Sequence, residues 1–145
     1  MPTGTTAEHL ERGRTLFNTD HFFEAHEVWE EAWLREHGDR RVLLQGLIQI
    51  AAGLLKASRA ERPSGCAQLL AAGLEKLDSF RGDPAGLDLA EFCRSVEEFQ
   101  AAAAPWLEGK TPSPREPFPR LQRTAAPRDR KRRFRKRPRR AKLPQ

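Results

Sequence analysis

Apolar residues recur three and four positions apart through roughly the first hundred residues of this chain, and no strand-like alternation competes with that spacing. Such spacing places apolar side chains on one face of an α-helix. A regular stripe of this kind consists of Leu89, Phe92, Val96, Phe99 and Ala103. The chain has 145 residues, which is enough for one domain with a buried core. The sequence therefore predicts an all-α fold, a compact bundle of about five helices.

Turn and capping residues divide this segment into helices. Thr5 and Glu8 have the spacing of a capping box, which predicts the start of the first helix. The residues expected to cap the next four helices are Asp20, Asp39, Ser64 and Asp88. Pro63 is expected to end the third helix and Pro105 the fifth. After Pro105, Trp106 is expected to fold back onto the core.

The positive charge is concentrated near the end of the chain. The whole chain has 26 Lys and Arg residues against 20 Asp and Glu residues, a net charge of +6. Residues 128–142 contain eleven of these basic residues and one acid, a charge of +10, so residues 1–127 carry −4. Between Gly109 and this run, prolines are frequent and apolar residues sparse. We therefore expect a helical domain over 5–108, a Pro-rich linker over 109–127 and a disordered basic tail over 128–145.

Residues 128–142, which we call the basic arm, have two interpretations. In the first, the arm binds RNA or DNA electrostatically, with Phe134 available to stack on a base. The residues expected to contact nucleic acid are Arg130, Lys131, Arg132, Arg133, Phe134, Arg135, Lys136 and Arg137. In the second, the arm is a solvated extension without a function. Even in the first interpretation the arm does not read a base sequence, because phosphate contacts position a protein without specifying bases.

Cysteine usage and hydropathy favour a cytoplasmic protein. Cys66 and Cys93 are isolated and form no CxxC motif, so we expect two core thiols in a reducing compartment. The first residues lack the apolar segment of a secretory signal. The most apolar segment, residues 43–55, contains two glutamines and is too short to span a bilayer. We therefore expect no membrane contact, and without a cofactor motif we expect no cofactor and no bound metal.

The predicted second helix, from Asp20 to Leu34, places a histidine and a carboxylate within an aromatic face. At about 100° per residue, one side of this helix carries Phe22, His26, Trp29, Glu30 and Trp33. A buried His–carboxylate pair is costly unless each polar atom has a partner. A hydrogen-bond network, a metal ion or a ligand would each meet this requirement.

The predicted third helix, from about Arg40 to Ala60, is apolar on nearly every face, as expected of a central helix. Gln45 and Gln49 lie on one stripe of it. A short turn makes the second and third helices antiparallel neighbours. We therefore expect both glutamines to hydrogen-bond with His26 and Glu30, because an amide can donate to a carboxylate and accept from an imidazole N–H.

Two motifs on these helices carry a family resemblance. HFFEAHEVWEEAW and the following LLQGLIQIAAGLLK resemble DUF309, a small all-helical family of uncharacterised function. The small residues and leucines of residues 65–77 are also similar, so the resemblance covers residues 15–77. It implies an all-α fold and no particular activity. The matching positions are His26, Glu27, Glu30, Trp33, Gln45, Gly46 and Gln49.

A structural hydrogen-bond network is the leading interpretation of His26 and Glu30, and a metal site is the sharper alternative. The two residues supply two ligands on one face, but HEVWE lacks the second histidine of HExxH. The remaining histidines, His9, His21 and His37, show no metal-ligand spacing. Acid–base catalysis by Glu30 is a further alternative.

The sequence therefore predicts a cytoplasmic helical binding or adaptor module without catalytic activity. Its basic arm is expected to bind RNA or DNA weakly, and it is expected to have a protein partner that the sequence does not identify. The alternative is a small metal-dependent or acid–base enzyme that uses His26 and Glu30. The candidate polar cluster consists of His26, Glu27, Glu30, Gln45 and Gln49.

Overall fold

The computed structural model describes residues 4–80, 84–110 and 117–124, and within them the fold is all-α, as predicted. The helices are α1 (Thr6–Asn18), α2 (Phe22–Trp33), α3 (Gly38–Ser58), α4 (Pro63–Leu77), α5 (Leu89–Ala102) and α6 (Ala104–Leu107). Two 3₁₀ turns, η1 (Asp78–Phe80) and η2 (Pro84–Gly86), lie between α4 and α5. Helices α1 to α5 are the predicted ones, and the single turn of α6 holds Trp106 in the core, also as expected.

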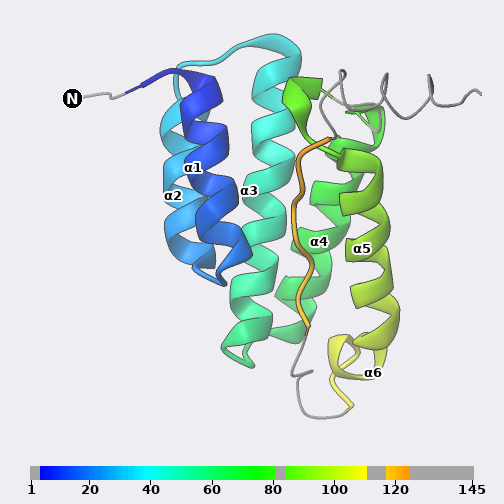
Figure 1. Cartoon of the computed structure of the whole chain (residues 1–145). Helices are drawn as coiled ribbons and strands as arrows, with labels where there is room; N and C mark the ends of the chain where they lie inside the picture. The colour runs from blue at the N-terminus through cyan, green and yellow to red at the C-terminus, as the bar shows by residue number, and fades with distance from the viewer. Residues whose placement is uncertain (1–3, 81–83, 111–116, 125–145) are drawn as a thin grey trace, which may run out of the picture.

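The five long helices run up and down in chain order (Figure 1). α1 packs on α2, α2 on α3 and α3 on α4, while α5 lies beside α4. Because α3 is flanked by two helices, most of its surface is buried, and this explains why its sequence is apolar on nearly every face. The largest fully buried side chains are Trp29, Phe17, Phe22, Phe92, Leu44, Leu47, Ile50, Leu54, Leu70, Leu77 and Leu89.

Two of the predicted helix starts are confirmed. The Thr5 side chain accepts a hydrogen bond from the Glu8 N–H, and the Glu8 carboxylate accepts one from the Thr5 N–H, which completes the capping box. Before α5, the Asp88 carboxylate accepts a hydrogen bond from the Glu91 N–H at 3.1 Å. In both cases a side-chain oxygen satisfies an N–H group that the first helical turn leaves unpaired.

The predicted caps at Asp20, Asp39 and Ser64 are wrong. Asp20 precedes the N-cap residue of α2, His21, and has a positive φ of 66°. Asp39 and Ser64 lie inside the first turns of α3 and α4, which begin one residue earlier. Pro63 therefore begins α4, where its fixed φ and missing N–H suit the first helical position.

Helices α3 and α4 approach closely because glycines face each other across their interface. A Cβ added to Gly73 would lie 2.8 Å from the carbonyl oxygen of Gly46, and one added to Gly46 would lie 3.2 Å from the carbonyl oxygen of Gly73. A Cβ on Gly53 would lie 2.9 Å from the Leu70 side chain. The glycines of α3 therefore allow α4 to approach α3 closely.

The interface between α1 and α2 is built around one tryptophan. The Trp29 indole is fully buried, and its N–H donates to the Leu10 carbonyl oxygen at 3.3 Å. Phe17 packs against the indole with ring centroids 5.8 Å apart. A Cβ added to Gly13 would lie 2.1 Å from Nε1 of Trp29. The indole therefore occupies the space that any side chain at position 13 would need.

Residues 117–124 form an extended segment, which we call the strap. It runs between α1 and α5 (Figure 1), and an isolated antiparallel bridge joins Arg123 to Leu87. Leu121 of the strap is fully buried. The strap falls within the predicted linker 109–127, whose prediction did not include packing against the core. The predicted basic tail, residues 128–145, lies outside the described residues.

Both cysteines are buried, Cys66 in α4 and Cys93 in α5, and they form no disulfide with each other. Burial raises the pKa of the Cys66 thiol to about 11, so this thiol stays protonated at neutral pH. In the part of the chain that the structure describes, no helix has the length and apolar character needed to cross a membrane.

Candidate functional site

The candidate polar cluster lies on the hairpin of α2 and α3, on helix faces turned away from the centre of the bundle. Glu27 and Glu30 are exposed, whereas His26, Gln45 and Gln49 are half-buried. Glu30 is therefore not buried beside His26, and that part of the prediction is wrong. The antiparallel arrangement of α2 and α3 is confirmed.

The predicted hydrogen bonds within the cluster are not formed among the described residues. Nδ1 of His26 and Oε1 of Gln49 are both buried without a hydrogen-bond partner, and so is Nε1 of Trp33. Buried polar atoms without partners are rare, and each one calls for a bridging water, a ligand or a rearrangement. The hairpin therefore carries unpartnered polar atoms instead of a closed network, and a function for the cluster stays a prediction.

The rotation of α2 about its axis explains this difference. Its buried residues are Phe22, Ala25, Val28, Trp29 and Ala32. Two of them are alanines, which allow neighbouring helices to approach this side closely. A prediction that relies on large side chains places His26 and Trp33 on the buried face. In the structure, both residues lie at the edge of the buried stripe. The prediction was rotated by about one residue, or about 100°, from the observed stripe.

The edge of this hairpin is rimmed by apolar and cationic side chains. The Arg41 guanidinium lies 3.9 Å from the centroid of the Trp33 ring, a cation–π contact that joins α3 to α2. The Phe23 ring stacks on His26 with centroids 6.1 Å apart. Phe23, Leu34 and Val42 are the exposed large apolar residues of the described chain. This surface can contact a partner, but its chemistry specifies none.

Histidines and carboxylates do not converge on a metal centre in the described ranges. There, no group of three or more His, Cys, Asp or Glu side chains has an arrangement that could hold a metal ion. His9 is engaged elsewhere. Its Nδ1 lies 2.9 Å from the Thr5 carbonyl oxygen and its Nε2 lies 3.0 Å from Oε1 of Glu31.

The contact of His9 with Glu31 joins α1 to α2 and is a site that sequence reasoning missed. The His9 side chain is fully buried, whereas Glu31 is 57% exposed. From the sequence, His9 is considered only as a possible metal ligand, and Glu31 is not singled out as a site residue. The sequence does contain a signal for the burial of His9. This residue lies four residues before Gly13 and eight before Phe17, on the buried stripe of α1.

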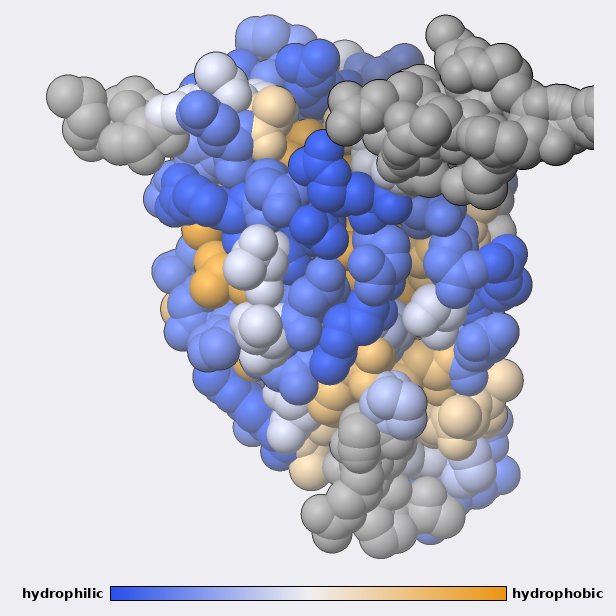
Figure 2. Space-filling view, viewed as in Figure 1, coloured by the Kyte–Doolittle hydropathy of each residue, from blue (hydrophilic) through white to orange (hydrophobic). Residues whose placement is uncertain are grey.

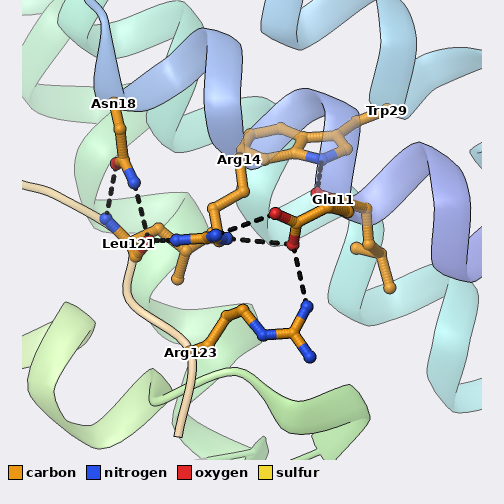
Figure 3. A network of polar contacts seen from close by, with 7 residues as sticks. Glu11, Arg14, Asn18, Trp29, Leu121 and Arg123 are labelled. Atoms are coloured by element: carbon orange, nitrogen blue, oxygen red, sulfur yellow. Dashed lines mark hydrogen bonds and ion pairs between the residues drawn. The ribbon is translucent and has the colours of Figure 1, made fainter.

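A second polar site that the sequence did not indicate holds the strap against α1. The Leu121 N–H donates to Oδ1 of Asn18 at 2.8 Å, and Nδ2 of Asn18 donates to the Leu121 carbonyl oxygen at 2.9 Å. Nη1 of Arg14 donates to the same carbonyl oxygen at 3.2 Å. Figure 3 shows both side chains reaching from α1 to the strap. These bonds reach the Leu121 backbone, so they hold an extended chain whatever its side chains are.

Glu11 links α1 to the strap by charge. It accepts hydrogen bonds from Nε and Nη2 of Arg14 at 3.1 and 2.8 Å, and from Nη1 of Arg123 at 3.1 Å (Figure 3). The hydrogen bond from Arg14, followed by the contribution of Arg123, lowers the pKa of the Glu11 carboxyl below its ordinary value. At the other end of the strap, Nη1 of Arg120 lies 3.1 Å from Oδ1 of Asp20.

Two apolar side chains anchor the strap between α1 and α5. Leu121 is fully buried, and the Phe118 ring packs against Phe22 and Phe99 with centroids 5.5 and 5.6 Å apart. Figure 2 shows apolar surface gathered around this lower end of the strap. We call the side chains that hold the strap the strap site: Glu11, Arg14, Asn18, Asp20, Phe22 and Phe99.

Comparison with models of protein families relates part of this structure to a known family. Residues 10–69 match DUF309, a domain of unknown function. Over this range, which we call the DUF309-like segment, the chain is similar to that family. This finding confirms the resemblance seen in the sequence motifs. A search of curated proteins gives no match to the chain.

The DUF309-like segment begins within α1 and ends within α4. It contains the candidate polar cluster and also Glu11, Arg14 and Asn18 of the strap site. Helix α5 and the strap lie outside it. The strap site therefore joins a surface of the DUF309-like segment to a part of the chain beyond the family match.

The substitution Glu11→Gln is expected to flatten the loss of stability in acid. The pKa of Glu11 is lower in the folded chain than in the unfolded chain. Its carboxylate therefore stabilises the fold at neutral pH, and this contribution is lost as pH falls below 4.5 through the folded pKa. The melting temperature of the wild type should exceed that of the variant at neutral pH, and the difference should shrink as the pH falls below 4.5.

Circular dichroism melts across this pH range measure the effect, which is less than about 1 kcal/mol because the Glu11 side chain is 43% exposed and solvent screens its ion pairs. Glu75→Gln, at an exposed position on α4, is the matched control. A difference between wild type and Glu11→Gln that stays constant with pH would show that the carboxylate does not titrate against Arg14 and Arg123.

Proposed function

We propose that this protein is a non-catalytic helical binding module whose basic arm binds RNA or DNA weakly and without base specificity. The observation that carries the proposal is the division of charge, +10 in residues 128–142 against −4 in the rest of the chain. Dense positive charge attracts phosphate over distances comparable to the Debye length. A negatively charged body repels it, so the arm is the binding element. We include a cytoplasmic location in this proposal.

The strap supports this proposal because it holds the chain shortly before the arm against the helical body. The Thr124 N–H donates to the Gly86 carbonyl oxygen at 2.9 Å, and the Asp88 N–H donates to the Gln122 carbonyl oxygen at 2.9 Å. The arm begins at Arg128, four residues after Thr124. The helical body therefore holds Thr124, the last described residue before the arm, near the N-terminal end of α5.

The full chain should bind single-stranded RNA in a salt-dependent manner, and a truncation after Ala126 should not bind. If about half of the eleven basic residues each neutralise one phosphate, the logarithm of affinity should fall with the logarithm of salt concentration at a slope of roughly −3 to −4. Fluorescence anisotropy with homopolymers of different bases, at low and physiological salt, measures both the slope and the lack of base preference.

The truncation keeps the strap, so its core stays complete, whereas a chain ending at residue 108 would lose Leu121. Phe134→Ala is the control for base stacking, which contributes about 1–3 kcal/mol where it occurs. Equal binding by the full chain and the truncation, or no binding by either at low salt, would contradict the proposed role of the arm.

A second candidate function is ligand binding or acid–base chemistry at His26 and Glu30, and one observation favours it. Nδ1 of His26 is buried without a hydrogen-bond partner, so an unfilled ligand position is available on that atom. Calorimetric titration of zinc into the wild type and into His26→Ala tests this candidate. Zinc binding that depends on His26 would support it, and the absence of zinc binding in both would argue against the metal-dependent form.

A further inference from the structure

The strap is held in the manner of a bound linear peptide. Asn18 forms two hydrogen bonds with the backbone of one residue, Leu121, at 2.8 and 2.9 Å. An amide that both accepts from an N–H and donates to a C=O replaces the pairing that a neighbouring β-strand would supply. Arg14 adds a third bond to the same carbonyl oxygen. The strap site thus fixes the strap by its backbone.

Side chains of the strap add specificity to this backbone contact. Phe118 packs on Phe22 of α2 and Phe99 of α5, and Leu121, three residues later, is fully buried. Arg120 and Arg123 pair with the carboxylates of Asp20 and Glu11 at the rim of the strap site, each at 3.1 Å. An aromatic residue and a leucine flanked by cations therefore define what the strap site accepts.

The strap also has the composition of a peptide ligand. Pro117 and Pro119 limit the backbone freedom of the free segment, so little entropy is lost when it binds in an extended form. Its backbone contacts to other segments consist of the short pairing with residues 86–88, in the part of the chain that the structure describes. The strap is held mainly by side chains of the strap site. These contacts can form equally well when the strap and the site belong to two different chains.

We propose that the strap site is a peptide-binding site that exchanges straps between two copies of this chain. The segment that fits it is residues 117–124, and a second copy supplies the same segment with the same two anchors and the same two arginines. The six residues 111–116, which lie outside the described residues, precede the strap and have a fully extended length of at most about 22 Å. Exchange yields a two-fold dimer that buries the same contacts twice. This proposal is independent of nucleic-acid binding by the arm.

Binding of the strap to its own body competes with exchange between two copies. A strap tethered to its own body has an effective concentration of about a millimolar, so the closed monomer prevails in dilute solution. Weakening the intrachain pairing while keeping the interchain pairing shifts the balance toward the dimer. The two ion pairs at the rim allow this change without altering the buried anchors.

The test uses two full-length variants with reversed charges. The first carries Arg120→Glu with Arg123→Glu, and the second carries Glu11→Lys with Asp20→Lys. In each variant alone, the strap and its own site repel each other. When the two are mixed, each site meets a strap of opposite charge, so both exchanged contacts are attractive. One variant is labelled with ¹⁵N so that native mass spectrometry identifies the mixed dimer by its mass.

The mixture is expected to contain a mixed dimer and to melt at a higher temperature than either variant alone. Each variant alone is the control for association through the arm, which both retain, and should remain monomeric. A mixture that contains only monomers, although circular dichroism shows both variants folded, would overturn the proposal. A synthetic peptide of residues 117–124 that binds the first variant, without any mixed dimer, would also overturn exchange and assign the site to a segment of another protein.

A second measurement applies if a variant fails to fold. Labelled and unlabelled wild-type chains are mixed at up to about millimolar concentration, where interchain binding competes with the tethered strap. Mixed-mass dimers are expected, and Asn18→Ala in both samples should abolish them because it removes both backbone bonds to Leu121. Wild-type chains that never form mixed dimers would overturn the proposal.

Discussion

The substitution Gly13→Ala is expected to destabilise the protein by about 2–4 kcal/mol. A Cβ at this position would lie 2.1 Å from Nε1 of Trp29, a distance at which one of the two helices must move. The indole cannot turn away, because it is fully buried against Phe17 and donates to the Leu10 carbonyl oxygen. Urea denaturation followed by tryptophan fluorescence measures both the loss of stability and the change around Trp29.

Gly65→Ala is the matched control for this prediction. Gly65 lies in the first part of α4, and a Cβ there would meet its nearest neighbour, the Lys56 side chain, at an ordinary 3.5 Å. Alanine favours the helix over glycine, so this variant should be unchanged or more stable by up to about 1 kcal/mol. Equal stabilities of the Gly13→Ala and Gly65→Ala variants would show that α1 and α2 are not in contact at Trp29.

The five long helices could be predicted because each carries its own period of apolar residues and its own breaks. The stripe from Leu89 to Ala103 predicts a helix from its own spacing, without information about the rest of the chain. Helix starts were less predictable, since several residue types suit neighbouring positions of a first turn. At α4, Pro63 begins the helix, and the side chain of Ser64 is not used as a cap. A proline can follow the end of one helix or stand in the first turn of the next. Its position in the sequence alone does not tell which of these two roles it has.

The arrangement around His26 could not be predicted to the accuracy that hydrogen bonds require. Helix periodicity locates a face to within about one residue, or about 100°, whereas a hydrogen bond tolerates a few tenths of an ångström. The small residues Ala25 and Ala32 decided which side of α2 is buried, because they permit close packing. An argument from large apolar side chains gives them too little weight.

The strap was hidden from sequence reasoning for a different reason. Its two anchors, Phe118 and Leu121, stand among prolines and arginines and follow no helical or strand period. Their burial depends on Asn18 and Phe99, which lie far away in sequence and belong to other elements. Only a tertiary contact distinguishes such a segment from a linker of the same composition.

The substitution Leu121→Ala is expected to destabilise the protein by about 2–4 kcal/mol and to release the strap. The Leu121 side chain is fully buried, so its truncation removes apolar contact and leaves a cavity next to α1. The strap has one other apolar anchor, Phe118, and its remaining contacts are ion pairs and hydrogen bonds to its backbone, which replace no buried apolar surface. Urea denaturation measures the loss of stability. Hydrogen exchange measures release, since the amides of Leu121 and Thr124 lose protection when their bonds to Asn18 and Gly86 open.

Gln122→Ala is the matched control, because the neighbouring side chain is exposed and its removal should change stability by less than about 0.5 kcal/mol. The two variants alter adjacent residues of the same extended segment, so a difference between them reports burial and not a change in the chain's local conformation. Global unfolding in Leu121→Ala would raise exchange in α3 and in the strap together. Faster exchange confined to the strap would instead show that the five helices hold their packing while the strap opens. If Leu121→Ala and Gln122→Ala are equally stable and equally protected, residues 117–124 do not complete the core, and the strap site loses its anchor.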